Sequence, residues 1–385
     1  MNKQWIEFAH NIKQLYGKGF VPLHEPTFNE KEVEYVTDCV KTGWVSSVGA
    51  YVTRFEEDLA KFVGVKRAVA VVNGTAALHI ALKIVGIEAN DEVLMPSLTF
   101  IATANAVSYL QVVPHFVDVN EETLGVDPLK LEAYLAEIAE LRNGELYNKQ
   151  TNRRIKALVP MHTFGHPCMM DKLVALCEKY QLVLVEDAAE SLGSYYKGKH
   201  TGTFGKVSAM SFNGNKIITT GGGGAILTDD EELADYAKHI TTTAKVPHRW
   251  EFNHDEIGFN YRMPNINAAL GCAQLEKLPE FIVQKQKLVE FYEGQVVNIE
   301  EIRLLKEPIE TKSNYWLQTI LLGEPYNRDE VLNFLNEQGI MSRPMWTPMH
   351  ELAMYKTCPR MDLSMTEQLK QKVINIPSTP IEVKS

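Results

Sequence analysis

The stretch Leu182–Ile226 reads LVLVEDAAESLGSYYKGKHTGTFGKVSAMSFNGNKIITTGGGGAI. Its first apolar strand ends at Asp187, its second contains Ser211, and Lys216 follows on an Asn/Gly turn before four glycines. An acid at a strand end, a hydroxyl and a lysine are the groups that pyridoxal phosphate (PLP) needs. The acid keeps the pyridine nitrogen protonated, the lysine joins the aldehyde carbon, and hydroxyls or amides bind the phosphate. We therefore adopt a PLP site as the working hypothesis for this stretch.

Each of these residues also has a plainer interpretation. Lys216 could be a solvated surface residue, as most lysines are, Asp187 could cap the Ala-rich segment that follows, and Ser211 could bond a neighbouring backbone group. The context favours function for two of them. Lys216 precedes glycines that let backbone approach a ligand closely. Asp187 follows an apolar run, so it is expected to be partly buried and to need a positive partner such as a protonated pyridine.

The composition is that of an ordinary globular protein, with 385 residues, 45% hydrophobic and 23% charged. A net charge of −10 argues against a nucleic-acid or acidic-membrane partner, although it leaves room for a local basic pocket. The five cysteines never occur as CxxC, so free thiols are expected rather than a metal site. No stretch approaches the roughly 20 apolar residues of a membrane span, and the N-terminus lacks an apolar signal segment. We therefore expect a cytoplasmic protein.

Apolar periodicity and glycine turns predict alternating strands and helices. Helices are expected at residues 30–41, 54–63, 75–85, 101–109, 170–180, 230–239, 267–278, 279–297, 328–338 and 366–373, and strands at 68–72, 92–95, 112–119, 155–161, 183–187, 207–212, 225–228 and 315–321. This order predicts an α/β fold with a mainly parallel sheet between helices. The C-terminal part is typical of a smaller α/β unit, which suggests domains at 1–250 and 251–385. A polar excursion follows Asp127, with helical periodicity up to Leu141 and an exposed turn or hairpin from Asn143.

Four candidate residues lie at or just after strand ends. They are Gly74, Phe100, His162 and Asp187. Ligands of parallel sheets gather outside the carboxyl ends of the strands, so these residues should share one rim. The Asn-Gly-Thr stretch around Gly74 opens a helix whose free N–H groups could bind an anion, although an ordinary strand–helix turn has the same pattern. Phe100 could stack on a flat ring or belong to the core.

Six motifs occur in order along the chain: NGTAALH, PSLTF, EDAAES, SFNGNK, TTGGGGA and FNYRMPNINAALG. Together they resemble the DegT-type sugar aminotransferases, which are PLP-dependent enzymes of fold type I in the aspartate aminotransferase superfamily. The resemblance covers nearly the whole chain. GWVSSVG, VPMHTFGHP, the excursion at 130–155 and SFNGNKIITTGGGGA are similar to the subgroup that acts on UDP-linked 4-keto-6-deoxy N-acetylhexosamines, on routes to bacillosamine- and legionaminic-acid-type sugars.

The resemblance implies a role for each motif residue. Lys216 would hold PLP and move the proton at the substrate carbon, Asp187 would pair with the pyridine nitrogen, and Phe100 would stack on the ring. The phosphate would be held by the amides of Gly74, Thr75 and Ala76, by Ser211, and by Asn260 of a neighbouring subunit. A site shared in this way implies a homodimer, and L-glutamate would be the amino donor. Further candidates for sugar-nucleotide contacts are Ser46, Ser47, His162, Lys245, His248, Arg262, Arg343, Trp346 and His350.

One residue departs from the family pattern. Many members carry Gln where this chain has Glu190, three residues after Asp187 and near the phenolic oxygen of the cofactor. A carboxylate would repel a phenolate there. Glu190 should therefore be protonated, share a proton with that oxygen, or turn away.

The resemblance implies a transaminase that moves an amino group from glutamate to a keto carbon, expected at C4, of a UDP-linked 6-deoxy N-acetylated hexosamine. A different keto position or nucleotide would suit the same motifs. A PLP-dependent sugar dehydratase of this fold would carry His in place of Lys216. A non-catalytic PLP-binding regulator would have no need of the complete set of Lys216, Asp187 and Ser211.

Overall fold

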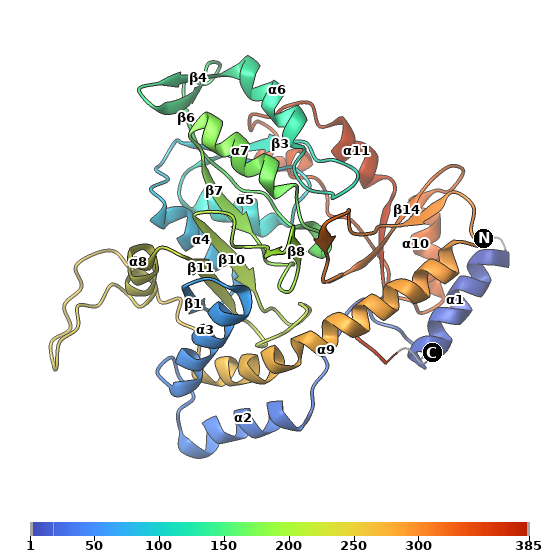
Figure 1. Cartoon of the computed structure of the whole chain (residues 1–385), viewed down its shortest axis with the longest axis horizontal. Coiled ribbons are helices and arrows are strands. Elements are labelled where there is room, and N and C mark those ends of the chain that lie inside the picture. The colour runs from blue at the N-terminus through green and yellow to red at the C-terminus, as the bar shows by residue number, and fades with distance from the viewer. Residues whose placement is uncertain (1–2, 18, 383–385) are drawn as a thin grey trace.

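The computed structural model describes residues 3–17 and 19–382 and has the expected α/β architecture, built on one large sheet (Figure 1). In sheet order its strands are β1 (Arg67–Val71), β11 (Gly224–Thr228), β10 (Val207–Ser211), β7 (Val183–Asp187), β6 (Arg154–Leu158), β2 (Glu92–Pro96) and β3 (Val113–Val117). Parallel pairs join β10, β7, β6, β2 and β3, whereas β11 runs antiparallel between β1 and β10. The prediction of a mainly parallel sheet is confirmed.

The excursion after Asp127 forms a helix and a hairpin. Helix α6 (Pro128–Ile138) ends three residues before the expected periodicity does, and β4 (Ala139–Arg142) pairs with β5 (Glu145–Asn148), which in turn pairs with β6. The hairpin turn contains Asn143 in the left-handed conformation, with φ 53°. The turn at Asn143 was expected, but β4 belongs to the residues assigned to the helix.

Two hydrophobic cores cover the two faces of the sheet. In β1 the side chains of Val69 and Val71 belong to one core and those of Ala68 and Ala70 to the other, because successive side chains of a strand point to opposite faces. The first core contains apolar residues of α4 (Gly74–Ile84), α5 (Ile101–Tyr109), α6, α7 (Met170–Tyr180) and α8 (Glu231–Thr241), and the second contains those of α3 (Ala50–Val63) and α9 (Asn265–Val296). Helix α2 (Glu30–Thr42) packs on α9 (Figure 1).

Helix α9 is continuous through Pro279, where the sequence predicted two helices. Pro279 is exposed, and apolar packing on both sides of the proline holds the helix together. The C-terminal half of α9 packs against α1 (Lys3–Tyr16), which the sequence analysis did not predict. Figure 1 shows α9 running from beneath the large sheet to α1.

The C-terminal part forms a second, antiparallel sheet. Its strands are β12 (Ile302–Leu304), β14 (Gln318–Leu322), β16 (Val373–Ile376) and β15 (Arg343–Pro344), with α10 (Arg328–Glu337) and α11 (Ser364–Lys370) beside them. The sequence predicted a helix up to Val373 and missed β16. A small third sheet joins β13 (Thr311–Lys312), β8 (Tyr195–Tyr196) and β9 (Lys199–His200), and short 3-10 helices lie at Thr163–Gly165, Met349–Glu351 and Ala353–Tyr355. The domain division after residue 250 stays a prediction.

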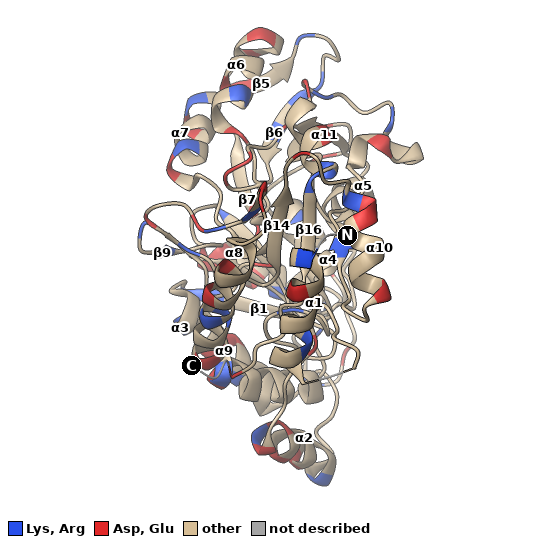
Figure 2. Cartoon of the chain, turned by 90° about the vertical axis from the view of Figure 1, so that its right-hand side faces the viewer, with Lys and Arg blue, Asp and Glu red and all other residues tan. Residues whose placement is uncertain are grey.

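In the part of the chain that the structure describes, the surface charges, the helix lengths and the cysteines point to no further functional site. Figure 2 shows basic and acidic residues mixed on the outer helices, including α6 and α7. Among residues 3–17 and 19–382, no helix combines the length and apolarity that crossing a bilayer requires. All five cysteines carry free thiols.

Candidate active site

The strand ends surround a cavity of about 330 Å³. Its walls contain eight of the sequence-predicted residues, namely Gly74, Thr75, Phe100, Asp187, Glu190, Ser211, Lys216 and Trp346. Residues that the sequence analysis did not single out complete the lining: Asn73, Leu78, Ala102, Met161, Ala189, Asn213, Asn215 and Trp316. Three of the four residues expected on one rim, Gly74, Phe100 and Asp187, line this cavity, which gathers residues from the ends of β1, β2, β7 and β10.

One end of the cavity is the N-terminus of α4. The Asn73 side chain caps this helix by accepting a hydrogen bond from the Ala76 N–H at 2.7 Å, so that amide is already used. The N–H groups of Gly74 and Thr75 remain at the positive end of the helix dipole, a natural place for an anion. Ser211 lies against Gly74 so closely that a Cβ on the glycine would approach the Ser211 Cβ to 2.8 Å.

Asp187 ends β7 and is buried. Its carboxylate accepts hydrogen bonds from the Thr103 hydroxyl at 2.6 Å and from the Ala189 N–H at 3.2 Å, both of them neutral donors. Burial raises the pKa of this carboxyl, and the two hydrogen bonds offset only part of that effect. A buried carboxylate that faces a cavity in this way fits a protonated ring nitrogen as its partner.

Lys216 follows β10 with its side chain mostly buried. Its Nζ lies 3.1 Å from Oε1 of Glu190 and 3.8 Å from the ring centroid of Trp316. The Trp316 indole N–H donates to the Asn215 carbonyl at 2.6 Å, which ties the aromatic ring to the turn that carries the lysine. The amine is therefore held between a carboxylate and an aromatic face.

Glu190 does not turn away from the cavity. One carboxylate oxygen contacts Lys216, and the other accepts the Phe164 N–H at 2.9 Å. Phe164 presents that N–H from a left-handed backbone conformation, with φ 56°. Burial raises the pKa of Glu190 to about 7, against the opposing effects of the Lys216 charge and the Phe164 hydrogen bond. Glu190 can therefore hold a proton at neutral pH, as two of the three sequence-based alternatives require.

The family profile of DegT/DnrJ/EryC1/StrS aminotransferases matches residues 26–382. The chain belongs to this aminotransferase family. It is 38% identical over 361 residues to the GDP-perosamine synthase of Escherichia coli O157:H7, covering 94% of each chain, and 38% identical over 328 residues to the putative PLP-dependent aminotransferase EpsN of Bacillus subtilis, covering 85% of this chain and 82% of that one. Among solved structures, Helicobacter pylori PseC, an aminotransferase in pseudaminic acid biosynthesis, superimposes with a TM-score of 0.84 at 25% identity over 93% of each chain.

The protein is thus a PLP-dependent sugar aminotransferase of fold type I, as the motifs indicated. Its cavity fits the cofactor on structural grounds. The free N–H groups and hydroxyl at the α4 end suit a phosphate, and the buried Asp187 suits the pyridine nitrogen. The fit rests on Gly74, Thr75 and Ser211 at the phosphate end, because the Ala76 N–H bonds Asn73.

The outer wall of the aminotransferase cavity is aromatic. The Trp346 ring lies 5.0 Å from that of Phe164 and 6.2 Å from that of Phe100, between centroids. The Phe100 side chain is half exposed, with 48% of its surface accessible, so it is free to cover a flat ligand. Trp316 was not predicted as a site residue, since it reaches the cavity only through tertiary packing, and Phe164 packs against Trp346 without lining the cavity.

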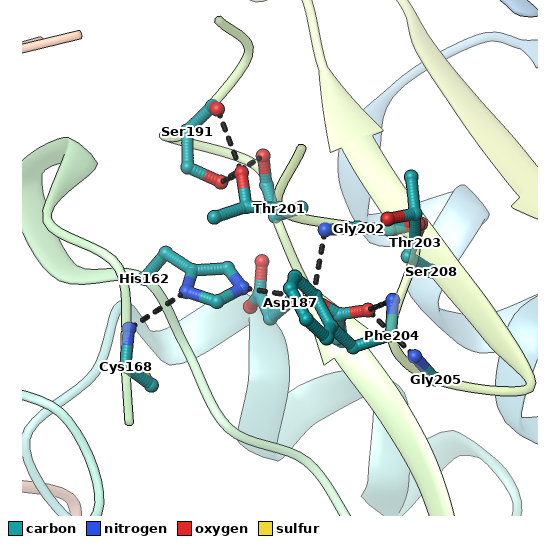
Figure 3. A network of polar contacts seen from close by, with 12 residues as sticks. His162, Cys168, Asp187, Ser191, Thr201, Gly202, Thr203, Phe204, Gly205 and Ser208 are labelled. Carbon is teal, nitrogen blue, oxygen red and sulfur yellow. Dashed lines mark hydrogen bonds and ion pairs between the residues drawn. The ribbon is translucent and has the colours of Figure 1, made fainter. Parts of the chain in front are cut away.

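His162 belongs to a buried network behind the aminotransferase cavity (Figure 3). Its Nε2 contacts Glu186 at 3.0 Å, and its Nδ1 accepts the Cys168 N–H at 3.1 Å. Because Nδ1 accepts a backbone N–H, it carries no proton, and Nε2 is the nitrogen that donates to Glu186. Glu186 also accepts three backbone N–H groups, from Gly202, Phe204 and Gly205. His162 lies outside the cavity lining and anchors the loop beside β7.

Seven of the other candidates also lie outside the cavity of their own chain. His350 is buried, with Nδ1 2.7 Å from the Ser97 hydroxyl. Ser46 and Ser47 lie in the loop after α2, and Arg343 lies near Asn336. Lys245, with its Nζ over the Phe252 ring, and His248 belong to the segment between α8 and α9 that extends from the molecule in Figure 1. Arg262 donates to the exposed Asn260, the predicted contributor to a neighbouring site.

Proposed function

We propose that this aminotransferase moves the amino group of L-glutamate to the keto carbon, at C4, of a UDP-linked 6-deoxy N-acetylated hexosamine. The product would be a precursor of di-N-acetylated sugars for surface polysaccharide or glycan. The main support for this proposal is that Lys216, Asp187 and Ser211 line one cavity in a chain of this family. The sugar and nucleotide rest on the motifs GWVSSVG and VPMHTFGHP and on the hairpin excursion.

The residue roles follow from the geometry of the cavity. Ser211 and the N–H groups of Gly74 and Thr75 would hold the phosphate, while Phe100 would cover the ring. Asp187 would keep the ring nitrogen protonated from its buried position. When bound, PLP supplies an electron sink for the carbon that carries the amino group.

Lys216 would hold the cofactor and would carry the proton at the substrate carbon. A lysine amine acts as a nucleophile or base only after it loses its own proton. In its carboxylate form Glu190 is placed to accept that proton, because its Oε1 lies 3.1 Å from Nζ, and a pKa raised to about 7 lets it hold the proton near neutral pH.

The residues outside the cavity support a homodimer. Val33, Val40, Trp44 and Val48 are more than half exposed along α2 and the loop after it, which leaves an apolar surface for a second copy. In the dimer, Asn260 of one subunit would reach the phosphate of the other. Lys245, His248 and Arg262 would approach the neighbour's sugar nucleotide in the same way.

A GDP-linked keto sugar is the second candidate substrate. It is favoured by the 38% identity to proteins named GDP-perosamine synthase, from Escherichia coli O157:H7 and Caulobacter vibrioides, over 94% and 93% of this chain. The nucleotide is distinguished by a few loop contacts, so overall similarity to these relatives leaves both candidates open.

The substrate is tested by incubating the purified holoenzyme with L-glutamate and a panel of keto sugars. The panel contains the UDP-linked 4-keto-6-deoxy N-acetylhexosamine, its 3-keto counterpart and a GDP-linked 4-keto-6-deoxyhexose, and products are identified by mass spectrometry. We expect amination of the UDP-linked 4-keto sugar with stoichiometric release of 2-oxoglutarate. Turnover of the GDP-linked sugar alone would transfer the assignment to that nucleotide. Absence of any aminated sugar would overturn the proposal.

Replacing Glu190 with glutamine should alter how the absorbance of the bound cofactor changes with pH. The wild-type carboxyl, with its pKa raised to about 7, becomes a carboxylate above that pH and then opposes loss of the phenolic proton. The amide of the substituted glutamine stays neutral and can donate to the phenolic oxygen, so the absorbance transition should move to lower pH. The measurement is a spectrophotometric titration of the holoenzyme, with thermal unfolding to check the fold.

Glu32→Gln provides the control for this titration. Glu32 is a buried glutamate that accepts a hydrogen bond from Gln274 and does not line the cavity. Its substitution should lower stability and leave the absorbance titration as in the wild type. An unchanged titration in the Glu190→Gln protein would contradict the role given to Glu190.

A further inference from the structure

Lys285 is a completely buried lysine in the middle of α9. Its Nζ donates to three backbone carbonyls: that of Tyr315 at 3.1 Å, that of Trp316 at 2.9 Å and that of Ser378 at 2.5 Å. Lysines are almost never fully buried without partners, because removing the charge from water is costly. The three carbonyls come from two segments distant in sequence, so this one side chain joins α9 to both.

The three acceptors require the ammonium form of Lys285. An ammonium has three N–H donors, one for each carbonyl, whereas a neutral amine has only two. Burial lowers the pKa of Lys285, and the carbonyl dipoles oppose that loss of charge. Burial and the positive charges of Lys285 and Lys216 hold the pKa of His24 well below its usual range, which keeps that ring neutral.

Trp316 connects Lys285 to the reactive amine. Lys285 holds the backbone of Trp316 through its carbonyl, and the Asn314 side chain accepts the Trp316 backbone N–H at 2.8 Å. The indole N–H bonds the Asn215 carbonyl, and the indole face lies 3.8 Å from Nζ of Lys216. A single residue therefore separates the buried ammonium from the amine in the cavity.

We propose that Lys285 is a positioning residue that fixes the Trp316 indole against Lys216 and thereby sets the reactivity of the Lys216 amine. An aromatic face at this distance attracts the ammonium group of Lys216 and holds it in place. Loss of the Lys285 contacts would free the Trp316 backbone and move the indole away. The inference rests on the proposed role of Lys216, although the contacts and the test below involve the cofactor-free protein.

The test is a double-mutant cycle on Lys285→Met and Trp316→Leu in the full-length, PLP-free protein. Methionine is unbranched like lysine and one atom shorter, and it removes the three donors. The readout is the rate at which acetic anhydride acylates Lys216 near neutral pH, measured by peptide mass spectrometry, with the exposed Lys206 as the internal reference. Without the aromatic face, Lys216 should react about five- to ten-fold faster in each single variant. The double variant should react no faster than Trp316→Leu alone.

Leu288→Ala is the matched control, because Leu288 is buried on the same helix within a hydrophobic cluster and makes no polar contact through its side chain. It should lower the unfolding temperature without altering Lys216 acylation. Independent, multiplicative effects in the double variant, or a Lys285→Met protein that acylates like the wild type, would overturn the proposal. Lys285→Gln, which keeps two donors, replaces Lys285→Met if that protein does not fold, and it should give a smaller rate increase in the same direction. Because no cofactor is used, these outcomes are independent of whether Lys216 binds PLP.

Discussion

Lys216→Ala protein should neither retain PLP covalently nor catalyse transamination, with activity reduced by roughly three orders of magnitude or more. Lys216 is the lysine whose Nζ faces the cavity, between Glu190 and the Trp316 ring. Its removal deletes both the attachment point and the group that carries the proton. Borohydride reduction followed by peptide mass spectrometry should find the cofactor on Lys216 in the wild type and on no peptide of the variant.

Lys206→Ala is the control for this experiment. Lys206 lies ten residues earlier and pairs with Asp230 at the surface, so its loss should leave both cofactor and activity intact.

The Lys216→Ala variant also tests whether two subunits share each active site. Mixing Lys216→Ala with Asn260→Ala subunits should restore about a quarter of the wild-type activity, because each mixed dimer contains one intact site. No recovery would contradict the contribution of Asn260 to the neighbouring subunit.

Asp187→Asn should lower kcat roughly 10²- to 10³-fold, the range found when one preorganised electrostatic contact is removed from a site. Asparagine has nearly the same shape, so it can still accept from Thr103, but it lacks the charge that keeps the ring nitrogen protonated. Thr103→Val is the matched variant, since it removes a neutral donor and leaves the carboxylate. We expect a much smaller loss of kcat there, and equal losses in the two variants would contradict the charge-based role.

The same substitution of Asp187 should have a different effect on the stability of the PLP-free protein. Burial raises the pKa of Asp187 above its value in the unfolded chain, so the folded state binds the proton more tightly. The stability of the wild type should therefore fall as the pH rises from the ordinary range of an aspartate through the folded-state pKa. Asp187→Asn should lack this component of the pH dependence, which thermal unfolding at a series of pH values measures.

Local patterns predicted most of the fold, because apolar residues repeat at a different spacing in the strands of the large sheet than in the helices that cover it. Helix α1 was missed although Trp5, Phe8 and Ile12 repeat at helical spacing. The antiparallel direction of β11 was not predicted either, although no helix separates it from β10 and parallel neighbours need a longer crossover. Pro279 was misjudged because a proline on the exposed side of a well-packed helix costs less than one inside it.

The sequence predicted those site residues that lie at or just after the ends of strands. These are Asp187, Ser211 and Lys216, and the sheet brings the ends of their strands together. Trp316 could not be found in this way, because its segment reaches the cavity through the Lys285 and Asn314 contacts. Two histidines were predicted to contact the substrate but lie outside the cavity. His162 and His350 satisfy their ring nitrogens with buried partners, which a sequence does not distinguish from ligand contacts.

Strand β11 has a consequence for the synthesis of the protein. It supplies hydrogen-bond partners to both β1 and β10, and the backbone of Asn73 lies so close to Gly224 that a Cβ there would meet it at 2.5 Å. Chains are made from the N-terminus, so β1 and the Gly74 turn emerge long before the strand that completes them. An interrupted product that ends before residue 224 therefore has two open strand edges, which promote aggregation, and an incomplete phosphate end. Because PLP stabilises only the state that binds it, it favours finished chains over such fragments.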